Sequence, residues 1–213
     1  MNRSDADTLW RIAGCLAREA AKVSRPGPAL PPLLFFTDPE RTPRPWEVAE
    51  RLPAGAGVIY RHFGAPDARE TALRLRDASR SRGVSLLIGL DEALAEGVGA
   101  DGVHLPERAI GEAAALSARR PGWMITAAFH DRTPLPALTG LDALIVSPAF
   151  PAGGASAASP ALGVPRLTEL AQTVGLPIYA LGGVDAKNAR ELEGSGACGI
   201  AGIGSIRAAF GPD

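Results

Sequence analysis

Pro177-Ile-Tyr-Ala-Leu-Gly-Gly-Val184 is the stretch of this sequence that decides the fold. A short apolar run ends there in two glycines, and a helical pattern begins after Asp185. Downstream, Gly199-Ile-Ala-Gly-Ile-Gly-Ser-Ile206 repeats the arrangement, with an apolar strand followed by a glycine-rich turn. Glycine turns at the carboxyl ends of strands expose backbone N–H groups to which an anion can bind. Two such turns, about 20 residues apart, are typical of the phosphate site of a (β/α)8 barrel.

Short apolar runs recur along the whole chain after residue 32, and helical patterns separate most of them. Continuous apolar runs of this length are typical of parallel strands that are buried on both faces. The predicted strands are Leu33–Phe36, Gly57–Tyr60, Ser85–Ile88, Gly102–His104, Trp123–Ala127, Ala143–Val146, Pro177–Ala180 and Gly199–Ile203. The predicted helices include Arg69–Ser81, Ile110–Arg119, Arg166–Thr173 and Ala186–Gly194. We therefore predict an α/β fold, a single (β/α)8 TIM barrel over residues 33–210.

The first 32 residues are predicted to form an N-terminal helix and a proline-rich linker. The helix covers Asp5–Val23, where the apolar residues recur at helical spacing on one face. Those residues are Leu9, Ile12, Ala13, Leu16 and Ala20. Arg25–Pro32 contains four prolines and is the predicted linker. We expect the helix to lie over the bottom or the side of the barrel.

Composition excludes several classes of protein. The chain has 213 residues, a formal net charge of −1 and 46% hydrophobic residues, which argues against a general binder of nucleic acid or of membrane surfaces. No apolar run approaches the roughly 18 residues needed to cross a bilayer, and the first residues carry no pattern of a secretory signal. Cys15 and Cys198 have no metal-like spacing, so both are expected to be buried thiols in a reducing, cytoplasmic setting.

Several segments are more specific than the barrel pattern. Gly99-Ala-Asp-Gly-Val-His-Leu105 is followed by Val146-Ser-Pro-Ala-Phe-Pro151, then by Pro160-Ala-Leu-Gly163 and by Ala180-Leu-Gly-Gly-Val184 with Asn188. In this order and spacing they resemble the thiamine-phosphate synthase and TenI superfamily, over roughly residues 33–210. The resemblance implies a role in thiamine biosynthesis and a ligand at the carboxyl ends of the strands, a thiazole phosphate or thiamine phosphate. The implied phosphate-binding residues are Gly182, Gly183, Gly202, Gly204 and Ser205.

The resemblance also implies magnesium, because in the synthase magnesium and basic side chains hold a departing pyrophosphate. Here the implied residues are largely replaced. Phe63 stands where the family has a lysine after the second strand, and Gly89 and Leu90 stand where it has Asn-Asp after the third. Pro106-Glu-Arg-Ala109 replaces the segment with the second metal-binding aspartate, and Ala128 replaces the serine after the fifth strand. The loop Ala152–Ser159 contains no charged residue. Asp91 and Glu107 are interpreted as ordinary carboxylates, so we assign no metal ligand and leave Mg²⁺ as an open question.

Four residues are predicted to contact the substrate. Arg61 can present a guanidinium fork to a phosphate or a carboxylate. Asp38 ends the first strand in the family's Thr-Asp pattern, and His104 and Phe150 are predicted pocket walls.

His130 is the predicted catalytic residue. It stands near the position at which TenI-type members carry a histidine that resembles a tautomerase acid/base. Imidazole groups titrate near neutral pH, which suits proton transfer on a thiazole ring.

Three functions stay open at this point. A thiamine-phosphate synthase, which is a transferase, is the one that the resemblance supports most broadly. A metal-free, TenI-like thiazole tautomerase needs none of the lost residues. A barrel that only binds a phosphorylated metabolite, or regulates a synthase, needs fewer still. Other phosphate-binding barrels, such as those of tryptophan or pyrimidine synthesis, share the terminal turns but not the two more specific segments. A homo-oligomer is also left open, and the loop Pro151–Gly163 is a candidate lid.

Overall fold

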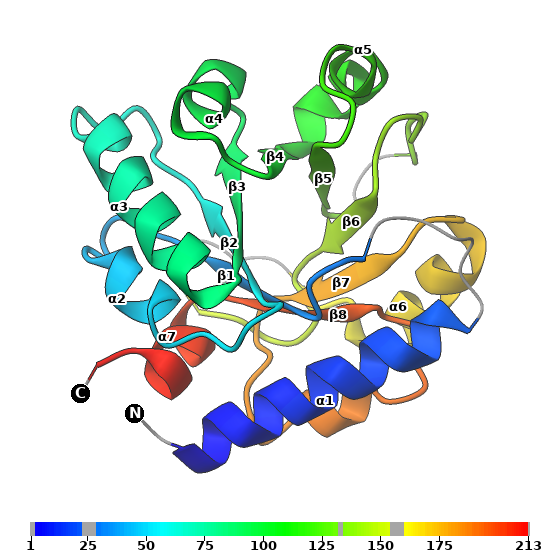
Figure 1. The fold of residues 1–213 in the computed structure, drawn as a ribbon. Helices are drawn as coiled ribbons and strands as arrows, with labels where there is room; N and C mark the ends of the chain where they lie inside the picture. The colour runs from blue at the N-terminus through cyan, green and yellow to red at the C-terminus, as the bar shows by residue number, and fades with distance from the viewer. Residues whose placement is uncertain (1–2, 23–28, 132–133, 154–159, 213) are drawn as a thin grey trace.

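The computed structural model describes residues 3–22, 29–131, 134–153 and 160–212. Eight parallel strands pair in chain order, and β8 closes on β1 to complete a barrel (Figure 1). The strands are β1 Leu33–Phe36, β2 Gly57–Tyr60, β3 Ser85–Gly89, β4 Gly102–Leu105, β5 Met124–Phe129, β6 Ala143–Val146, β7 Ile178–Leu181 and β8 Gly199–Gly202. The predicted (β/α)8 barrel is confirmed, and every predicted strand is present with small shifts at its ends.

Helical segments connect the strands. They are α2 Pro45–Ala49, α3 Ala68–Arg82, α4 Glu92–Val98, the 3-10 helix η1 Glu107–Glu112, α5 Ala113–Arg119, α6 Gly163–Thr173, the 3-10 helix η3 Ala189–Leu192 and α7 Gly204–Phe210. The predicted helix Ile110–Arg119 is therefore partly wrong, because its first turn is 3-10 and α-helix begins only at Ala113.

The predicted helix Ala186–Gly194 is also wrong, since only the four-residue η3 forms there. Side chains replace the helical hydrogen bonds at its start. The Asp185 carboxylate accepts from the backbone N–H groups of Lys187 and Asn188, and the Asn188 amide oxygen accepts from that of Asp185. Such local bonds from Asp and Asn favour turns over helices.

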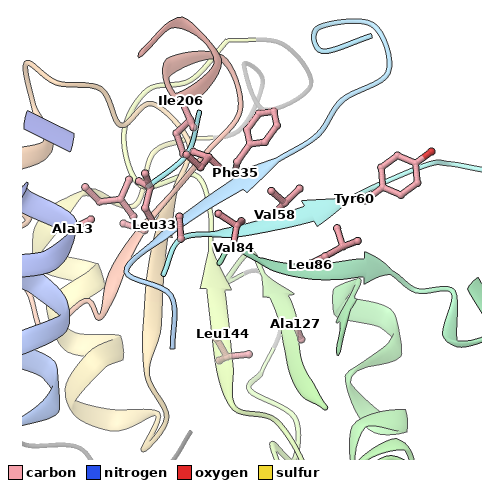
Figure 2. Close-up of a cluster of buried hydrophobic side chains, with 14 of the residues drawn as sticks. Ala13, Leu33, Phe35, Val58, Tyr60, Val84, Leu86, Ala127, Leu144 and Ile206 are labelled. Carbon is pink, nitrogen blue, oxygen red and sulfur yellow. The ribbon is translucent and has the colours of Figure 1, made fainter. Parts of the chain in front are cut away.

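The N-terminal helix α1, Arg3–Ala21, packs along the side of the barrel against β1, β8, η3 and α7 (Figure 1). Its predicted apolar face is buried, and Ala13 lies in the same core cluster as Leu33 of β1 (Figure 2). The connections after β7 and β8 contain only short helices, so α1 covers strand surface that they leave open. Of the predicted linker, residues 25–28 lie outside the described residues.

Alternating side chains of the strands build two core layers. Leu33, Phe35, Val58 and Leu86 face the surrounding helices (Figure 2). A second cluster contains the intervening residues of the strands, namely Leu34, Phe36, Ile59, Leu87, Ala143, Ile145, Tyr179 and Ala201. Since side chains alternate along a strand, this second set fills the barrel interior. The barrel is a packed core, and a ligand has room only at its ends.

The two cysteines differ in burial. Cys198 is buried at the base of β8, and burial raises the pKa of its thiol to about 12. The expectation that both thiols are buried is wrong for Cys15, which is only half-buried on α1. Among the helices that the structure describes, none is long and apolar enough to cross a membrane.

Candidate functional site

A cavity of about 1690 Å³ opens at the carboxyl ends of the strands, and the loops after all eight strands contribute to its wall. Nearly all the predicted site residues line it. They are Asp38, Arg61, His104, His130, Gly182, Gly183, Gly202, Gly204 and Ser205. Phe150 is the exception: its half-buried ring packs against the hydrophobic core instead of lining the cavity. The predicted pocket role of Phe150 is therefore wrong, because its side chain packs against the core.

The turn after β7 has the backbone that its two glycines predict. Gly182 and Gly183 have φ values of +92° and +68°, which side chains other than glycine rarely adopt. The turn packs on the loop after β6, since Phe150 N–H donates to the carbonyl of Gly182 at 3.0 Å. The Asn188 side chain donates to the carbonyl of Gly183 at 2.8 Å and fixes the other side of the turn.

A residue that the sequence reasoning missed lies against the turn after β8. The Nη2 atom of Arg41 would be 2.6 Å from a Cβ at Gly204, so the guanidinium occupies the space of the missing side chain. Asp38 sets up this approach, because its Oδ1 accepts from the backbone N–H groups of Glu40 and Arg41. The barrel topology could have predicted this contact. Because β1 and β8 are neighbours in a closed barrel, the loop after β1 must face the glycines after β8.

Arg61 is held at the mouth of the barrel by its own neighbours. Its Nε donates to the carbonyl of Thr37 at 2.9 Å, and its Nη2 lies 3.7 Å from an Asp38 carboxylate oxygen. Its guanidinium carbon lies 5.5 Å from the ring centre of Phe36 and 5.3 Å from that of Phe63. Burial lowers the pKa of Arg61, while the charge of Asp38 raises it and that of Arg41 lowers it.

His62 and Asp91 pair across the loops after β2 and β3. His62 Nε2 lies 3.5 Å from Asp91 Oδ2, and its Nδ1 accepts from Gly64 N–H. Asp91 also caps α4, since its Oδ1 accepts from Leu94 N–H at 2.8 Å. Both oxygens of Asp91 therefore already have partners on the protein.

His104 forms part of the cavity floor. Its Nδ1 lies 3.0 Å from the hydroxyl of Thr126 on β5, and its ring meets Phe36 edge-on. Burial, together with the charges of Arg61 and His130, lowers the pKa of His104 to about 3. His104 is therefore a neutral imidazole at physiological pH, which suits a hydrogen-bonding wall and not a proton acceptor.

His130 is paired with a carboxylate that the sequence reasoning left as an ordinary surface group. Its Nδ1 lies 2.6 Å from Oε2 of Glu107, which follows β4, and both residues line the cavity. An ionised carboxylate can only accept, so in the neutral form of this imidazole Nδ1 carries the proton and Nε2 keeps the lone pair. The neighbouring Asp131, at φ +55°, binds Arg166 of α6 through two hydrogen bonds of 2.6 and 2.8 Å. Those bonds lower the pKa of Asp131 and anchor the loop that carries His130.

Comparison with known proteins agrees with this architecture. The profile of the family described as thiamine monophosphate synthase matches residues 33–206. The chain belongs to this family. A thiamine-phosphate synthase of Archaeoglobus fulgidus is 31% identical over 187 residues, covering 84% of this chain and 87% of its own. One of Chloroflexus aurantiacus is 35% identical over 161 residues, covering 73% and 74%.

Solved structures place the fold in the same family. A thiamine phosphate pyrophosphorylase of Pyrococcus furiosus superposes with a TM-score of 0.69 at 26% identity, covering 84% of this chain and 91% of that one. An N-(5'-phosphoribosyl)anthranilate isomerase of the same organism has a TM-score of 0.57 at 11% identity and shares the fold alone.

Family membership raises the question of magnesium, and the residues here do not fit that ion. Gly89 and Leu90 offer no side-chain oxygen, and Asp91 is bonded to Leu94 and near His62. Within the described ranges, no three His, Cys, Asp or Glu side chains come close enough together to hold a metal ion. The neighbouring strand occupies the space beside Gly89, because a Cβ there would be 3.2 Å from the carbonyl oxygen of Tyr60 and 3.5 Å from Cγ of Arg61.

The candidate lid of this thiamine monophosphate synthase family member lies partly outside the described residues. Pro151–Gly163 was the candidate, and its middle, residues 154–159, lies outside the described residues. Pro151, Ala152 and Gly153 line the cavity, so the loop begins at the site.

Proposed function

We propose that this chain binds a phosphorylated thiazole, as thiazole phosphate or thiamine phosphate, and moves a proton on the ring through His130 without a metal ion. The observation that carries the proposal is the 2.6 Å contact between His130 Nδ1 and Glu107 Oε2 in the wall of the cavity. A histidine oriented by a carboxylate, beside an open cavity, is the usual arrangement of a general acid/base.

The phosphate end of the ligand is proposed to bind between the turns after β7 and β8. Gly182, Gly183 and Gly204 line this part of the cavity, together with the hydroxyl of Ser205. The guanidinium of Arg41 lies against Gly204 and supplies a positive charge that matches a phosphate.

The proposed reaction is an isomerisation in which atoms balance within the ligand. Nε2 of His130 takes a proton from one atom of a non-aromatic thiazole tautomer, and the resulting imidazolium returns a proton to another ring atom. Glu107 accepts the Nδ1–H bond throughout, which holds the ring orientation and stabilises the imidazolium. The aromatic product needs no leaving group, so the absence of a pyrophosphate-binding apparatus does not weaken this reaction.

Turnover of a thiazole phosphate tautomer, followed by NMR, tests the proposal. His130→Asn is expected to lower kcat by about 10²- to 10⁴-fold, which is the contribution of a positioned acid/base group. Glu107→Gln should lower kcat with little change in KM and should shift the pH profile of kcat, because the carboxylate no longer faces the imidazolium. Glu112→Gln is the matched control, since Glu112 is exposed at the other end of η1. Undiminished turnover by His130→Asn would contradict the assignment.

A second candidate is a barrel that binds without catalysis, and the internal pairing of Arg61 with Asp38 and Thr37 favours it. It predicts that thiamine phosphate or thiazole phosphate raises the melting temperature while no isomerisation occurs. The coupling reaction named for the family's relatives is checked in the same assay with both precursors and excess Mg²⁺. Coupling at a rate above that of the reaction without protein would favour the synthase over both.

A further inference from the structure

Two large apolar side chains stand exposed at the mouth of the cavity on neighbouring loops. Phe63 follows β2 and is 68% exposed, and Leu90 follows β3 and is 45% exposed. Both line the cavity, and β2 pairs directly with β3. Exposed side chains of this size gain little from packing, so core packing does not explain why apolar residues stand at these two positions.

The backbone makes the same two residues unusual. Phe63 has φ +49° and Leu90 has φ +62°, a region that bulky side chains avoid. Holding such a residue there costs free energy, and residues of this kind cluster at functional sites. Glycine would remove the strain, yet two of the most apolar residue types occupy these positions.

Phe63 completes a stack with the guanidinium of Arg61. The guanidinium carbon lies 5.5 Å from the ring centre of Phe36 and 5.3 Å from that of Phe63. The Nη2 atom of Arg61 is buried and makes no hydrogen bond with any described group. Arg61 thus has a phenyl ring near its guanidinium, and among the described residues its side chain makes one hydrogen bond, from Nε to the carbonyl of Thr37.

The charges on this side disfavour a polyanion. Asp38 lies beside Arg61 and offsets its positive charge, and Asp91 places a second carboxylate beside His62. A diphosphate placed here would face both carboxylates without the lysine and magnesium that relatives bring. An uncharged flat ring meets no such repulsion and gains area against Phe63 and Leu90.

We infer that Phe63 and Leu90 form a subsite for the uncharged aromatic ring of a small ligand whose phosphate lies at the glycine turns. This deepens the proposed function and rests on it for the position of the phosphate. The ligand class is a phosphate monoester of an aromatic or heteroaromatic ring, and the ring lies against Phe63 and Leu90.

Four probes separate the parts of this inference: inorganic phosphate, benzyl phosphate, benzyl alcohol, and pyrophosphate with Mg²⁺. Binding is followed by calorimetry and by ligand-observed NMR for the weakest probe. Benzyl phosphate is expected to bind at least tenfold more tightly than inorganic phosphate, and pyrophosphate with Mg²⁺ no more tightly than inorganic phosphate. Phe63→Ala should lower benzyl phosphate affinity about tenfold, the loss expected for one aromatic contact, and leave phosphate affinity unchanged.

Two further variants guard against indirect effects. Phe63→Gly removes the ring and relieves the backbone strain, so it should melt at or above the wild-type temperature while losing the same affinity. Leu73→Ala is the matched control, because Leu73 is an exposed apolar residue of α3 that does not line the cavity.

The outcomes distinguish the two proposals. If phosphate does not bind but benzyl alcohol does, and Phe63→Ala abolishes that binding, the ring subsite stands and the phosphate site fails. If the affinity ratio of benzyl phosphate to phosphate is the same in Phe63→Ala, Leu90→Ala and wild type, the subsite is overturned. Tighter binding of pyrophosphate with Mg²⁺ than of benzyl phosphate overturns it too, as does a failure of all four probes to bind.

Discussion

Gly183 lies so close to Pro151 that a Cβ on the glycine would be 2.5 Å from the proline's carbonyl oxygen. The turn after β7 and the loop after β6 are therefore in backbone contact, and the contact shapes the cavity wall. Gly183→Ala is expected to destabilise the protein by about 3 kcal/mol or more, from the left-handed backbone and the backbone clash together.

Gly175→Ala supplies the control for that measurement. Gly175 has φ +71°, but a Cβ there meets nothing within 4 Å. Its variant should lose only the roughly 1–2 kcal/mol of the backbone conformation. Urea unfolding of both variants measures the difference, and equal losses would show that the contact with Pro151 contributes nothing.

Arg41 is expected to contribute to anion binding and little to stability. Arg41→Gln should lower the affinity for inorganic phosphate about tenfold, because one charge-assisted interaction is lost. Gly204→Ala should act in the same direction, since its methyl group displaces the guanidinium and meets no backbone atom of another segment. Arg44→Gln is the control, as Arg44 is exposed and pairs with Glu47. Unchanged phosphate affinity in both Arg41→Gln and Gly204→Ala would remove Arg41 from the site.

Much of this architecture follows from local sequence. Runs such as Leu33–Phe36 and Ala143–Val146 are buried on both faces, so composition alone marks them as inner strands. The glycines at 182 and 183 mark a backbone that other residues cannot adopt, and the structure has that backbone. These features are set by residues close together in the chain.

The pairs that give the site its chemistry are set by closure of the barrel. Glu107 and His130 are separated by 23 residues and meet because β4 and β5 are neighbours. Arg41 reaches Gly204 because β8 returns to β1. Sequence patterns show which loops are adjacent but not which side chains turn toward each other, so Glu107 was interpreted as a solvated group. The prediction that Phe150 lines the pocket is wrong because an apolar loop residue can pack into the core as well as into a cavity.

His104 should make the protein sensitive to mild acid. Its pKa is about 3 in the folded state, below the ordinary 6.5, so the unfolded chain binds a proton that the folded chain excludes. This contribution to stability is fully present above pH 6.5 and is lost as pH falls from there toward 3, at up to about 1.4 kcal/mol per pH unit. His104→Asn removes the titrating group, so its stability difference from wild type should change by that slope between pH 7 and pH 4. A difference that stays constant with pH would contradict the assignment.

Magnesium is expected to leave this protein unaffected. The resemblance to the family implies a magnesium-binding aspartate at the place of Leu90, which has φ +62°. Millimolar Mg²⁺ should therefore not raise the melting temperature, since only binding to the native state does so. Leu90→Asp is the informative variant, because aspartate tolerates the left-handed conformation better than leucine and restores a carboxylate beside Asp91.

Two separate effects are expected in Leu90→Asp. Without metal, relief of the backbone strain should let Leu90→Asp melt at or above the wild-type temperature at pH 7, despite repulsion from Asp91. Leu90→Asn measures the effect of the backbone without the added charge. With Mg²⁺, Leu90→Asp should gain stability as the concentration rises and Leu90→Asn should not, because only the carboxylate adds a charged ligand. Ca²⁺ and high NaCl serve as ionic controls. Stabilisation of the wild type by Mg²⁺, equal to that of Leu90→Asp, would mean that a magnesium site exists without the family's aspartate, and the reading of this rim as a wall without metal ligands would be wrong.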